Sequence, residues 1–264
     1  MRGVKNMVTC ESPIAVIDSG VGGISVLKRL WKLMPNEKYI YFGDSKNAPY
    51  GVRPTEEIKS LTFKSAESLI STGAKELVIA CNTATSAAAA ELRKKYPDFP
   101  IVGLEPALKP AALSGGRPTV IVMATELTLR EKKFAALVER FKNNAEIIGL
   151  PAPGIVELVE ASKADSKEMD EYLRKLFSPF DKDKEYCLVL GCTHFPFAKK
   201  AIRRVMGNRV RLFDGAEGAA RHAKELLEEK GLLCPQGQQG RIIFKNSDES
   251  HIALSKKLFE DYEV

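Results

Sequence analysis

Two cysteines lie in nearly the same local sequence, and they are the residues best placed to do chemistry. Cys81 lies in the segment LVIACNT at 77–83, and Cys192 has the same position in LVLGCTH at 188–194. In each copy an apolar run leads to a small residue, a thiol and two polar residues, and a helical pattern follows. Two thiols that face one carbon from opposite sides could remove a proton on one face and return one on the other. The duplication therefore indicates racemisation.

Strand-like and helix-like patterns alternate along the chain and predict an α/β protein. Strands are expected at 14–17, 39–42, 77–80, 101–102, 120–123, 147–150, 188–191 and 210–213. Helices are expected at 23–33, 55–71, 83–95, 128–141, 167–177, 197–206 and 217–230. This alternation is typical of mostly parallel sheets covered by helices. The strand runs are almost wholly apolar, which indicates strands buried on both faces.

A second similarity extends the duplication beyond the cysteines. IAVIDS at 14–19 resembles VIVMAT at 120–125. We therefore expect two similar, mostly parallel-sheet α/β domains with a pseudo-two-fold relation and the active site in the cleft between them. Prolines between 97 and 118 mark the first crossing between the halves. We predict a first lobe formed by residues 1–102 and completed by 214–264, and a second lobe formed by residues 103–213. The tail beyond residue 233 has a strand-like run at 242–244 and a helical pattern at 251–262.

The acid/base assistants of the two thiols follow from the same topology. Ligands of α/β sheets bind beyond the carboxyl ends of the strands, where Asp18, Cys81 and Cys192 are expected. A free thiol has a pKa of about 8.5, and a helix N-terminus beside it stabilises the thiolate. His194, two residues beyond Cys192, and Asp18 are the candidate assistants. Short polar side chains beside helix-start amides could orient a carboxylate and an amine, or could merely cap helices: Ser19, Asn82, Thr83, Thr125 and Thr193.

Composition excludes several other classes of protein. The 264 residues are 44% hydrophobic and carry a net charge of +6, as in a globular protein with acids and bases interleaved. No basic stretch alternates with aromatics, so no nucleic-acid partner is expected. No apolar run is long enough for a membrane span. Residues 1–12 have no export signal and are expected to be a disordered lead-in, which predicts a cytoplasmic protein with reduced cysteines.

Other interpretations of the same residues remain open at this point. The Gly-rich turn at 20–23 could cradle a phosphate in a phosphotransferase, but no Gly-x-x-x-x-Gly-Lys pattern accompanies it. Cys192 and His194 are two types of metal ligand, yet the chain has no Cys-x-x-Cys pair, and we expect no metal. His222 and His251 are expected to be surface residues. A non-catalytic module that binds an acidic amino acid is a further alternative.

Four motifs together resemble the cofactor-independent glutamate racemases of the aspartate/glutamate racemase superfamily. They are DSGVGG at 18–23, NAPYG at 47–51, ACNTAT at 80–85 and GCTHFP at 191–196. The resemblance covers roughly residues 13 to 232. Related aspartate racemases typically have an acid where His194 stands, so the resemblance favours glutamate. A racemase for aspartate or another acidic amino acid is the alternative.

The resemblance implies a two-thiol enzyme that interconverts L- and D-glutamate without pyridoxal phosphate, metal or other cofactor. Cys81 would act on the D-enantiomer and Cys192 on the L-enantiomer, assisted by Asp18 and His194 respectively. The implied substrate contacts are Ser19, Tyr50, Gly51, Asn82, Thr83, Thr125, Thr128 and Thr193. Glu160 matches a family acid near the site, but Ala152 stands where many members have cysteine, and Glu160 is left out of the predicted catalytic set. The resemblance also implies D-glutamate supply for bacterial peptidoglycan and a homodimer.

Overall fold

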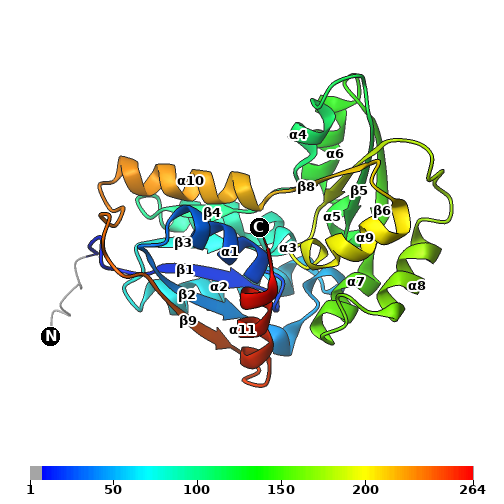
Figure 1. The fold of residues 1–264 in the computed structure, drawn as a ribbon. Coiled ribbons are helices and arrows are strands. Elements are labelled where there is room, and N and C mark those ends of the chain that lie inside the picture. The colour runs from blue at the N-terminus through cyan, green and yellow to red at the C-terminus, as the bar shows by residue number, and fades with distance from the viewer. Residues whose placement is uncertain (1–7, 264) are drawn as a thin grey trace, which may run out of the picture.

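The computed structural model describes residues 8–263, which build two parallel sheets in two lobes (Figure 1). Sheet A has the strand order β4-β3-β1-β2-β9, and sheet B has the order β6-β5-β7-β8. The strands of sheet A are β1 (Ile14–Asp18), β2 (Lys38–Gly43), β3 (Glu76–Ile79), β4 (Ile101–Gly103) and β9 (Arg241–Asn246). Those of sheet B are β5 (Thr119–Ala124), β6 (Glu146–Pro151), β7 (Tyr186–Leu190) and β8 (Val210–Asp214). The predicted two-domain α/β fold is confirmed.

The two sheets repeat one topology. The order β4-β3-β1-β2 of sheet A matches β8-β7-β5-β6 of sheet B, strand for strand, and β9 extends sheet A beyond β2. All the pairings are parallel. In both sheets a thiol therefore follows the equivalent strand, β3 or β7, directly beside the first strand of its lobe. The boundaries 1–102 with 214–264, and 103–213, stay a prediction.

The helices follow the predicted pattern with a few differences. They are α1 (Ile24–Leu33), α2 (Thr55–Ile70), α3 (Asn82–Lys95), α4 (Leu108–Ala112), α5 (Glu126–Arg130), α6 (Lys132–Phe141), α7 (Pro153–Glu160), α8 (Lys167–Leu176), α9 (Lys199–Met206), α10 (Ala216–Glu229) and α11 (His251–Asp261), with the 3₁₀ turns η1 (Ser45–Asn47), η2 (Tyr50–Val52) and η3 (Phe195–Ala198). The single helix expected at 128–141 is wrong, because Glu131 is extended, with φ −66° and ψ 139°, and separates α5 from α6. The sequence pattern also missed α4 and α7, which are short.

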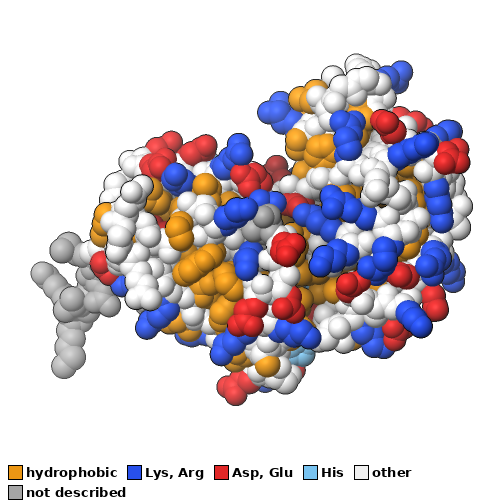
Figure 2. All heavy atoms as spheres, viewed as in Figure 1, with side chains coloured by type: hydrophobic (Ala, Val, Ile, Leu, Met, Phe, Trp, Pro, Cys, Tyr) orange, Lys and Arg blue, Asp and Glu red, His pale blue; other side chains and the backbone are white. Residues whose placement is uncertain are grey.

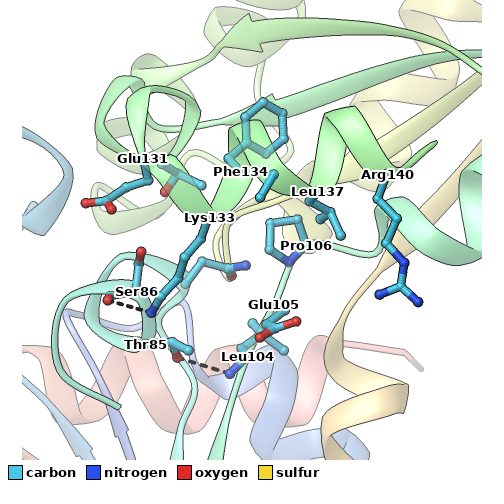
Figure 3. Close-up of a pocket in the computed structure, with 13 residues that line it drawn as sticks. Thr85, Ser86, Leu104, Glu105, Pro106, Glu131, Lys133, Phe134, Leu137 and Arg140 are labelled. Atoms are coloured by element: carbon cyan, nitrogen blue, oxygen red, sulfur yellow. Dashed lines mark hydrogen bonds between the residues drawn. The ribbon is translucent and has the colours of Figure 1, made fainter. Parts of the chain in front are cut away.

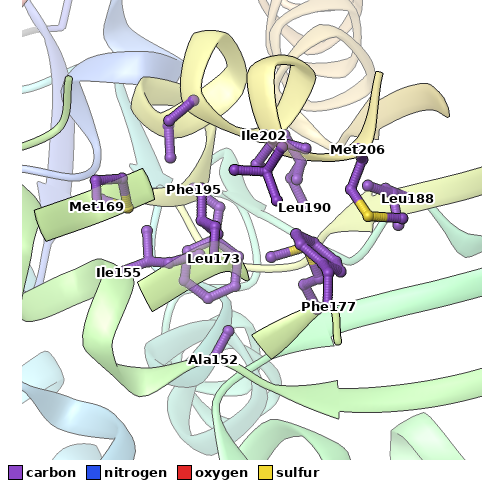
Figure 4. Close-up of a cluster of buried hydrophobic side chains, with 14 of the residues drawn as sticks. Ala152, Ile155, Met169, Leu173, Phe177, Leu188, Leu190, Phe195, Ile202 and Met206 are labelled. Carbon is purple, nitrogen blue, oxygen red and sulfur yellow. The ribbon is translucent and has the colours of Figure 1, made fainter. Parts of the chain in front are cut away.

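Helices cover both faces of each sheet, and alternate strand residues fill the two layers. Leu188 and Leu190 of β7 pack on α8 and α9 (Figure 4). Val189 of the same strand faces the layer under α4 and α6. Burying a side chain of this size contributes about 1.5–3 kcal/mol, so a strand buried on both faces must be apolar throughout. Val21, from the first lobe, joins the core of the second lobe. The lobes therefore share packed surface just beyond β1.

The beginning of the chain departs from the expected disordered lead-in. Residues 1–7 of that prediction lie outside the described residues. At 9–12 the chain forms a turn, in which the amide of Ser12 donates to the carbonyl of Thr9 at 3.0 Å. Buried Lys75 donates from Nζ to the carbonyl of Cys10 at 2.7 Å. The expectation is therefore wrong for this turn, because a buried ammonium anchors it.

None of the helices in the described part of the chain is long and apolar enough to cross a membrane. On the face shown in Figure 2, basic and acidic side chains are interspersed over both lobes.

Lys75 holds three distant segments together. Its Nζ lies 2.5 Å from Oε2 of Glu37 and also donates to the carbonyl of Leu232 at 2.9 Å, and both ionic side chains are buried. Glu37 in turn accepts from the amide of Cys234 at 2.8 Å. The pair therefore ties the 9–12 turn, the entry to β2 and the segment after α10 to one point.

We predict that Lys75→Met destabilises the protein by about 3–5 kcal/mol, because it leaves the Glu37 charge buried and unpaired. Urea unfolding followed by circular dichroism measures the change. Lys142→Met is the matched control, since the Lys142–Glu139 pair is exposed and its loss should change the free energy of unfolding little. Equal stabilities of the two variants would contradict the role given to Lys75.

Candidate active site

Cys81 lies at the N-cap of α3, directly after β3. Its side chain is buried, and the amide of Ala84 donates to Sγ at 3.4 Å. Burial and the charge of Asp18 raise the pKa of the Cys81 thiol to about 12, while the hydrogen bonds from Ala84 and Ser19 oppose that shift. Cys81 is therefore a thiol at neutral pH in this closed arrangement, and a cation or a hydrogen-bond donor must favour its thiolate during any reaction.

Asp18 ends β1 and joins the two lobes. Its Oδ1 accepts from the amide of Gly20 at 3.0 Å, and its Oδ2 accepts from the hydroxyl of Thr193 at 3.0 Å. Burial raises the pKa of Asp18, and the charge of His194 opposes the shift. The carboxyl group acts on Cys81 through its charge, and its direct partners are Gly20 and Thr193. Asp18 is thus placed between the thiol motifs.

Cys192 follows β7 and forms a polar chain with His194 and Glu160. The Sγ of Cys192 lies 3.7 Å from Nδ1 of His194, and Nε2 of His194 lies 2.7 Å from Oε1 of Glu160. Burial would lower the pKa of His194, but Cys192 and Glu160 on either side raise it well above its ordinary value. Burial likewise favours the neutral form of Glu160, yet His194 holds its pKa below the ordinary value. These two partners therefore favour the cationic form of the buried imidazole, which can stabilise a Cys192 thiolate.

The local structure after Cys192 differs from the one after Cys81. Cys81 caps an α-helix directly, as expected. After Cys192 the chain first forms η3, with Pro196 in its first turn, and α9 begins only at Lys199. A neighbouring imidazolium therefore replaces much of the stabilisation that a helix N-terminus would give to this thiol.

The Gly-rich turn after β1 serves close packing between the lobes. The amide of Val21 donates to Oε1 of Glu160 at 2.9 Å. A Cβ atom at Gly20 would lie 2.0 Å from Oε1 of Glu160, and one at Gly22 would lie 2.4 Å from Nδ1 of His194. Only glycine allows the backbone to approach these side chains so closely. The turn thus has a structural explanation that needs no phosphate.

Three threonines and one glycine among the predicted substrate contacts meet at another contact between the lobes. The hydroxyl of Thr83 lies 3.5 Å from that of Thr125, which caps α5 and lies 3.0 Å from the hydroxyl of Thr128. A Cβ atom at Gly51 would lie 2.7 Å from Cγ2 of Thr125. Tyr50 beside it is buried and donates its hydroxyl to Oδ2 of Asp44 at 2.7 Å. These contacts connect α3 and η2 of the first lobe with α5 of the second.

A cavity of about 340 Å³ opens between the lobes next to this contact (Figure 3). Asn82 and Thr128 line it, and Lys133 of α6 reaches across to donate to the carbonyl of Ser86 at 2.9 Å. Neither thiol lines this cavity, although Asn82, the residue after Cys81, does. Among the described residues, Oδ1 of Asn82 is buried without a hydrogen-bond partner. This amide oxygen is available to a ligand.

Two side chains that the sequence analysis set aside belong to this site. Glu160, left out of the predicted catalytic set, is the direct partner of His194. His251, expected on the surface, is only 27% exposed, and its Nε2 lies 3.7 Å from Oε2 of Glu160. The one sequence signal for Glu160 was its match to a family acid. No pattern in the sequence indicated that the beginning of α11 returns to this point.

The predicted site residues therefore gather around the contact between the lobes, with Ser19, Asp18 and Cys81 on one side and Thr193, His194 and Cys192 on the other. A profile of the Asp/Glu/Hydantoin racemase family matches residues 5–223 of the chain. The chain belongs to the Asp/Glu/Hydantoin racemase family. It is an isomerase of the racemase class.

Individual relatives of this racemase agree with the family match. It is 46% identical over 252 residues to a protein of Clostridium perfringens named glutamate racemase, and the match covers 95% of this chain and 97% of the relative. It also resembles the structure of glutamate racemase from Thermus thermophilus in complex with beta-chloro-D-alanine, with a TM-score of 0.79, 35% identity, and coverage of 97% of this chain and 96% of that one. The structure of glutamate racemase from Francisella tularensis in complex with D-glutamate matches with a TM-score of 0.80, 26% identity, and coverage of 95% and 94%.

Within residues 8–263, no group of three or more His, Cys, Asp or Glu side chains is arranged to hold a metal ion. The arrangement around the thiols instead offers proton donors and acceptors on both sides of the contact between the lobes.

We predict that iodoacetamide alkylates Cys192 of this racemase faster than Cys81 in the free protein. Cys81 is 6% exposed, and its pKa of about 12 leaves little thiolate, so its rate should rise roughly tenfold per pH unit from pH 7 to 10. Peptide mass spectrometry after timed quenching gives both rates. Buried Cys187 is an internal control for unfolding. Alkylation of Cys81 at the rate of Cys192 would contradict the described environment of Cys81.

Proposed function

We propose that the protein interconverts L-glutamate and D-glutamate by a 1,1-proton transfer between Cys81 and Cys192, without pyridoxal phosphate or metal. The observation that carries the proposal is the equivalent position of the two thiols, each directly after the matching strand of a repeated topology. The charge of Cys192 is also among the causes that raise the pKa of Cys81, which supports a common electrostatic environment. The names of the relatives favour glutamate as the substrate.

The proposed transfer consumes and produces no other compound. With D-glutamate, the Cys81 thiolate accepts the α-proton, and the electron pair of the broken C–H bond is delocalised into the carboxylate. The Cys192 thiol then donates its proton to the opposite face and becomes a thiolate. L-glutamate reverses these roles. Between turnovers, proton exchange with solvent restores the starting thiol and thiolate.

The chemical difficulty is the weak acidity of the α-proton beside an ionised carboxylate. Preorganised donors in a closed, water-poor site must stabilise the charge as it develops. In our proposal the His194 imidazolium stabilises the Cys192 thiolate. Protonation of Asp18, whose raised pKa favours uptake of a proton, removes the negative charge that disfavours the Cys81 thiolate. The substrate contacts we propose are Ser19, Tyr50, Gly51, Asn82, Thr83, Thr125, Thr128 and Thr193.

The closed contact between the lobes has a consequence for substrate entry. The thiol of Cys81 is buried, and the cavity of Figure 3 does not include it. We therefore propose that the lobes separate to admit glutamate and close for catalysis. The proposed biological role is D-glutamate supply for bacterial peptidoglycan in the cytoplasm, by a homodimer.

The experiment incubates each pure enantiomer of glutamate with the protein in deuterated water, without added cofactor. We expect loss of optical rotation together with one α-deuterium per inverted molecule, because the donated proton comes from an exchanged thiol. Circular dichroism and proton NMR follow the two events. Parallel assays with aspartate test the alternative substrate. Saturable glutamate binding without turnover would instead identify a binding module.

Cysteine variants separate the roles of the two thiols. Cys81→Ala and Cys192→Ala should each lower racemisation by at least about 100-fold, because either inversion needs both groups. In Cys192→Ala, residual α-deuterium exchange should be confined to D-glutamate, and in Cys81→Ala to L-glutamate. Cys10→Ala is the matched control, since Lys75 and Cys234 donate to the backbone carbonyl of Cys10, which the substitution keeps. Full racemisation by either active-site variant would reject the mechanism.

A further inference from the structure

The C-terminal segment packs against both lobes. Strand β9 pairs with β2 at the edge of sheet A, and Phe259 of α11 packs against Trp31 of α1 with ring centroids 6.2 Å apart. On its other side, α11 contributes Leu254 to the core of the second lobe. After α11, the ring of Tyr262 lies 4.9 Å from that of Phe197 in η3. In Figure 1, α11 is the red helix near α1.

The first residue of this helix, His251, is held on both sides by polar groups. Its Nδ1 lies 3.4 Å from Oδ2 of Asp248 and 3.2 Å from the hydroxyl of Ser250. Its Nε2 lies 3.7 Å from Oε2 of Glu160. The ring is therefore oriented by its own turn and directed toward an acid of the second lobe.

Glu160 has one satisfied oxygen and one that lacks a hydrogen bond. Oε1 accepts from the amide of Val21 and pairs with His194. Oε2 is buried and, among the described residues, has no hydrogen-bond partner, and Nε2 of His251 faces it at 3.7 Å. A buried carboxylate oxygen is costly unless a donor or a positive charge compensates it. The imidazole of His251 is the side chain placed to compensate this oxygen.

We propose that His251 is a positioning residue, which holds Glu160 through Oε2 so that Oε1 orients His194 toward Cys192. This inference rests on the proposed function, in which His194 supports the Cys192 thiolate. It gives the C-terminal helix a defined part in the site: Asp248, His251, Glu160 and His194 form one polar series that ends at Cys192. Cys81 stands outside this series, so the two thiols differ in their support although their strands are equivalent.

The first test measures iodoacetamide alkylation of Cys192 and needs no turnover. In His251→Ala, Glu160 loses the group that faces Oε2, and His194 therefore loses its fixed orientation. We expect the alkylation rate of Cys192 to fall about tenfold. This is the lower end of the roughly 10–100-fold effects seen when partners that orient metal-binding histidines are removed. The rate of Cys81 should not change. His251→Gln keeps an N–H donor of similar reach and should restore most of the Cys192 rate. An unchanged Cys192 rate in His251→Ala would overturn the proposal.

The second test measures racemisation and separates positioning from mere support of the fold. His251→Ala should lower kcat/KM about tenfold with rescue by His251→Gln, whereas His222→Ala, at an exposed histidine of α10, should leave it unchanged. Leu254→Ala loosens the packing of α11 without touching the polar series, and it should lower the melting temperature but not the Cys192 alkylation rate. An equal loss of the Cys192 alkylation rate in Leu254→Ala and His251→Ala would show a purely structural role and overturn the proposal. Failure of the proposed function itself would appear as inactive wild-type protein, with the alkylation result still interpretable.

Discussion

The close approach of the 20–22 turn to His194 and Glu160 is the contact on which the rest of the site depends. It requires glycine at two positions, since a Cβ atom at either would overlap a side chain of the other lobe. It also carries Val21 into the core of the second lobe. The acids and the imidazole that it encloses lose water, and their charges therefore act on one another strongly. A buried Asp18, a raised pKa of His194 and a raised pKa of the Cys81 thiol are consequences of that closure.

The repeated topology accounts for the equivalent placement of the two thiols, and the local structure around each thiol accounts for their differences. The shared strand order places a cysteine after β3 and after β7, next to the strand that begins each lobe. Cys81 caps a full α-helix, whereas Cys192 precedes a 3₁₀ turn and lies beside His194. Among the described residues, sheet B has no counterpart of β9. Helix α11, which follows β9, packs against both lobes and places His251 3.7 Å from Glu160, the partner of His194. The two thiols therefore have equivalent positions in the repeated topology but different local environments.

Much of the fold and the positions of both thiols could be predicted from the sequence. Buried parallel strands must be apolar, and ligands bind at the carboxyl ends of such strands. Eight strands and the two thiol positions followed from that rule. The break at Glu131 did not, since the helical pattern of the sequence continues across this residue although its backbone is extended. Glu160 and His251 were missed for a related reason. Each meets its partner through packing between distant segments, and no local spacing records such a contact.

The central claim is that two sulfur atoms flank the stereocentre of one bound substrate. An experimental structure of the protein with glutamate bound measures this directly, through the distances from each Sγ to the α-carbon. Our account predicts one sulfur on each face of that carbon, both at about 3.5 Å, the separation of reacting atoms poised for transfer. Both sulfurs on one face, or either one too far from the α-carbon to exchange a proton with it, would contradict the account.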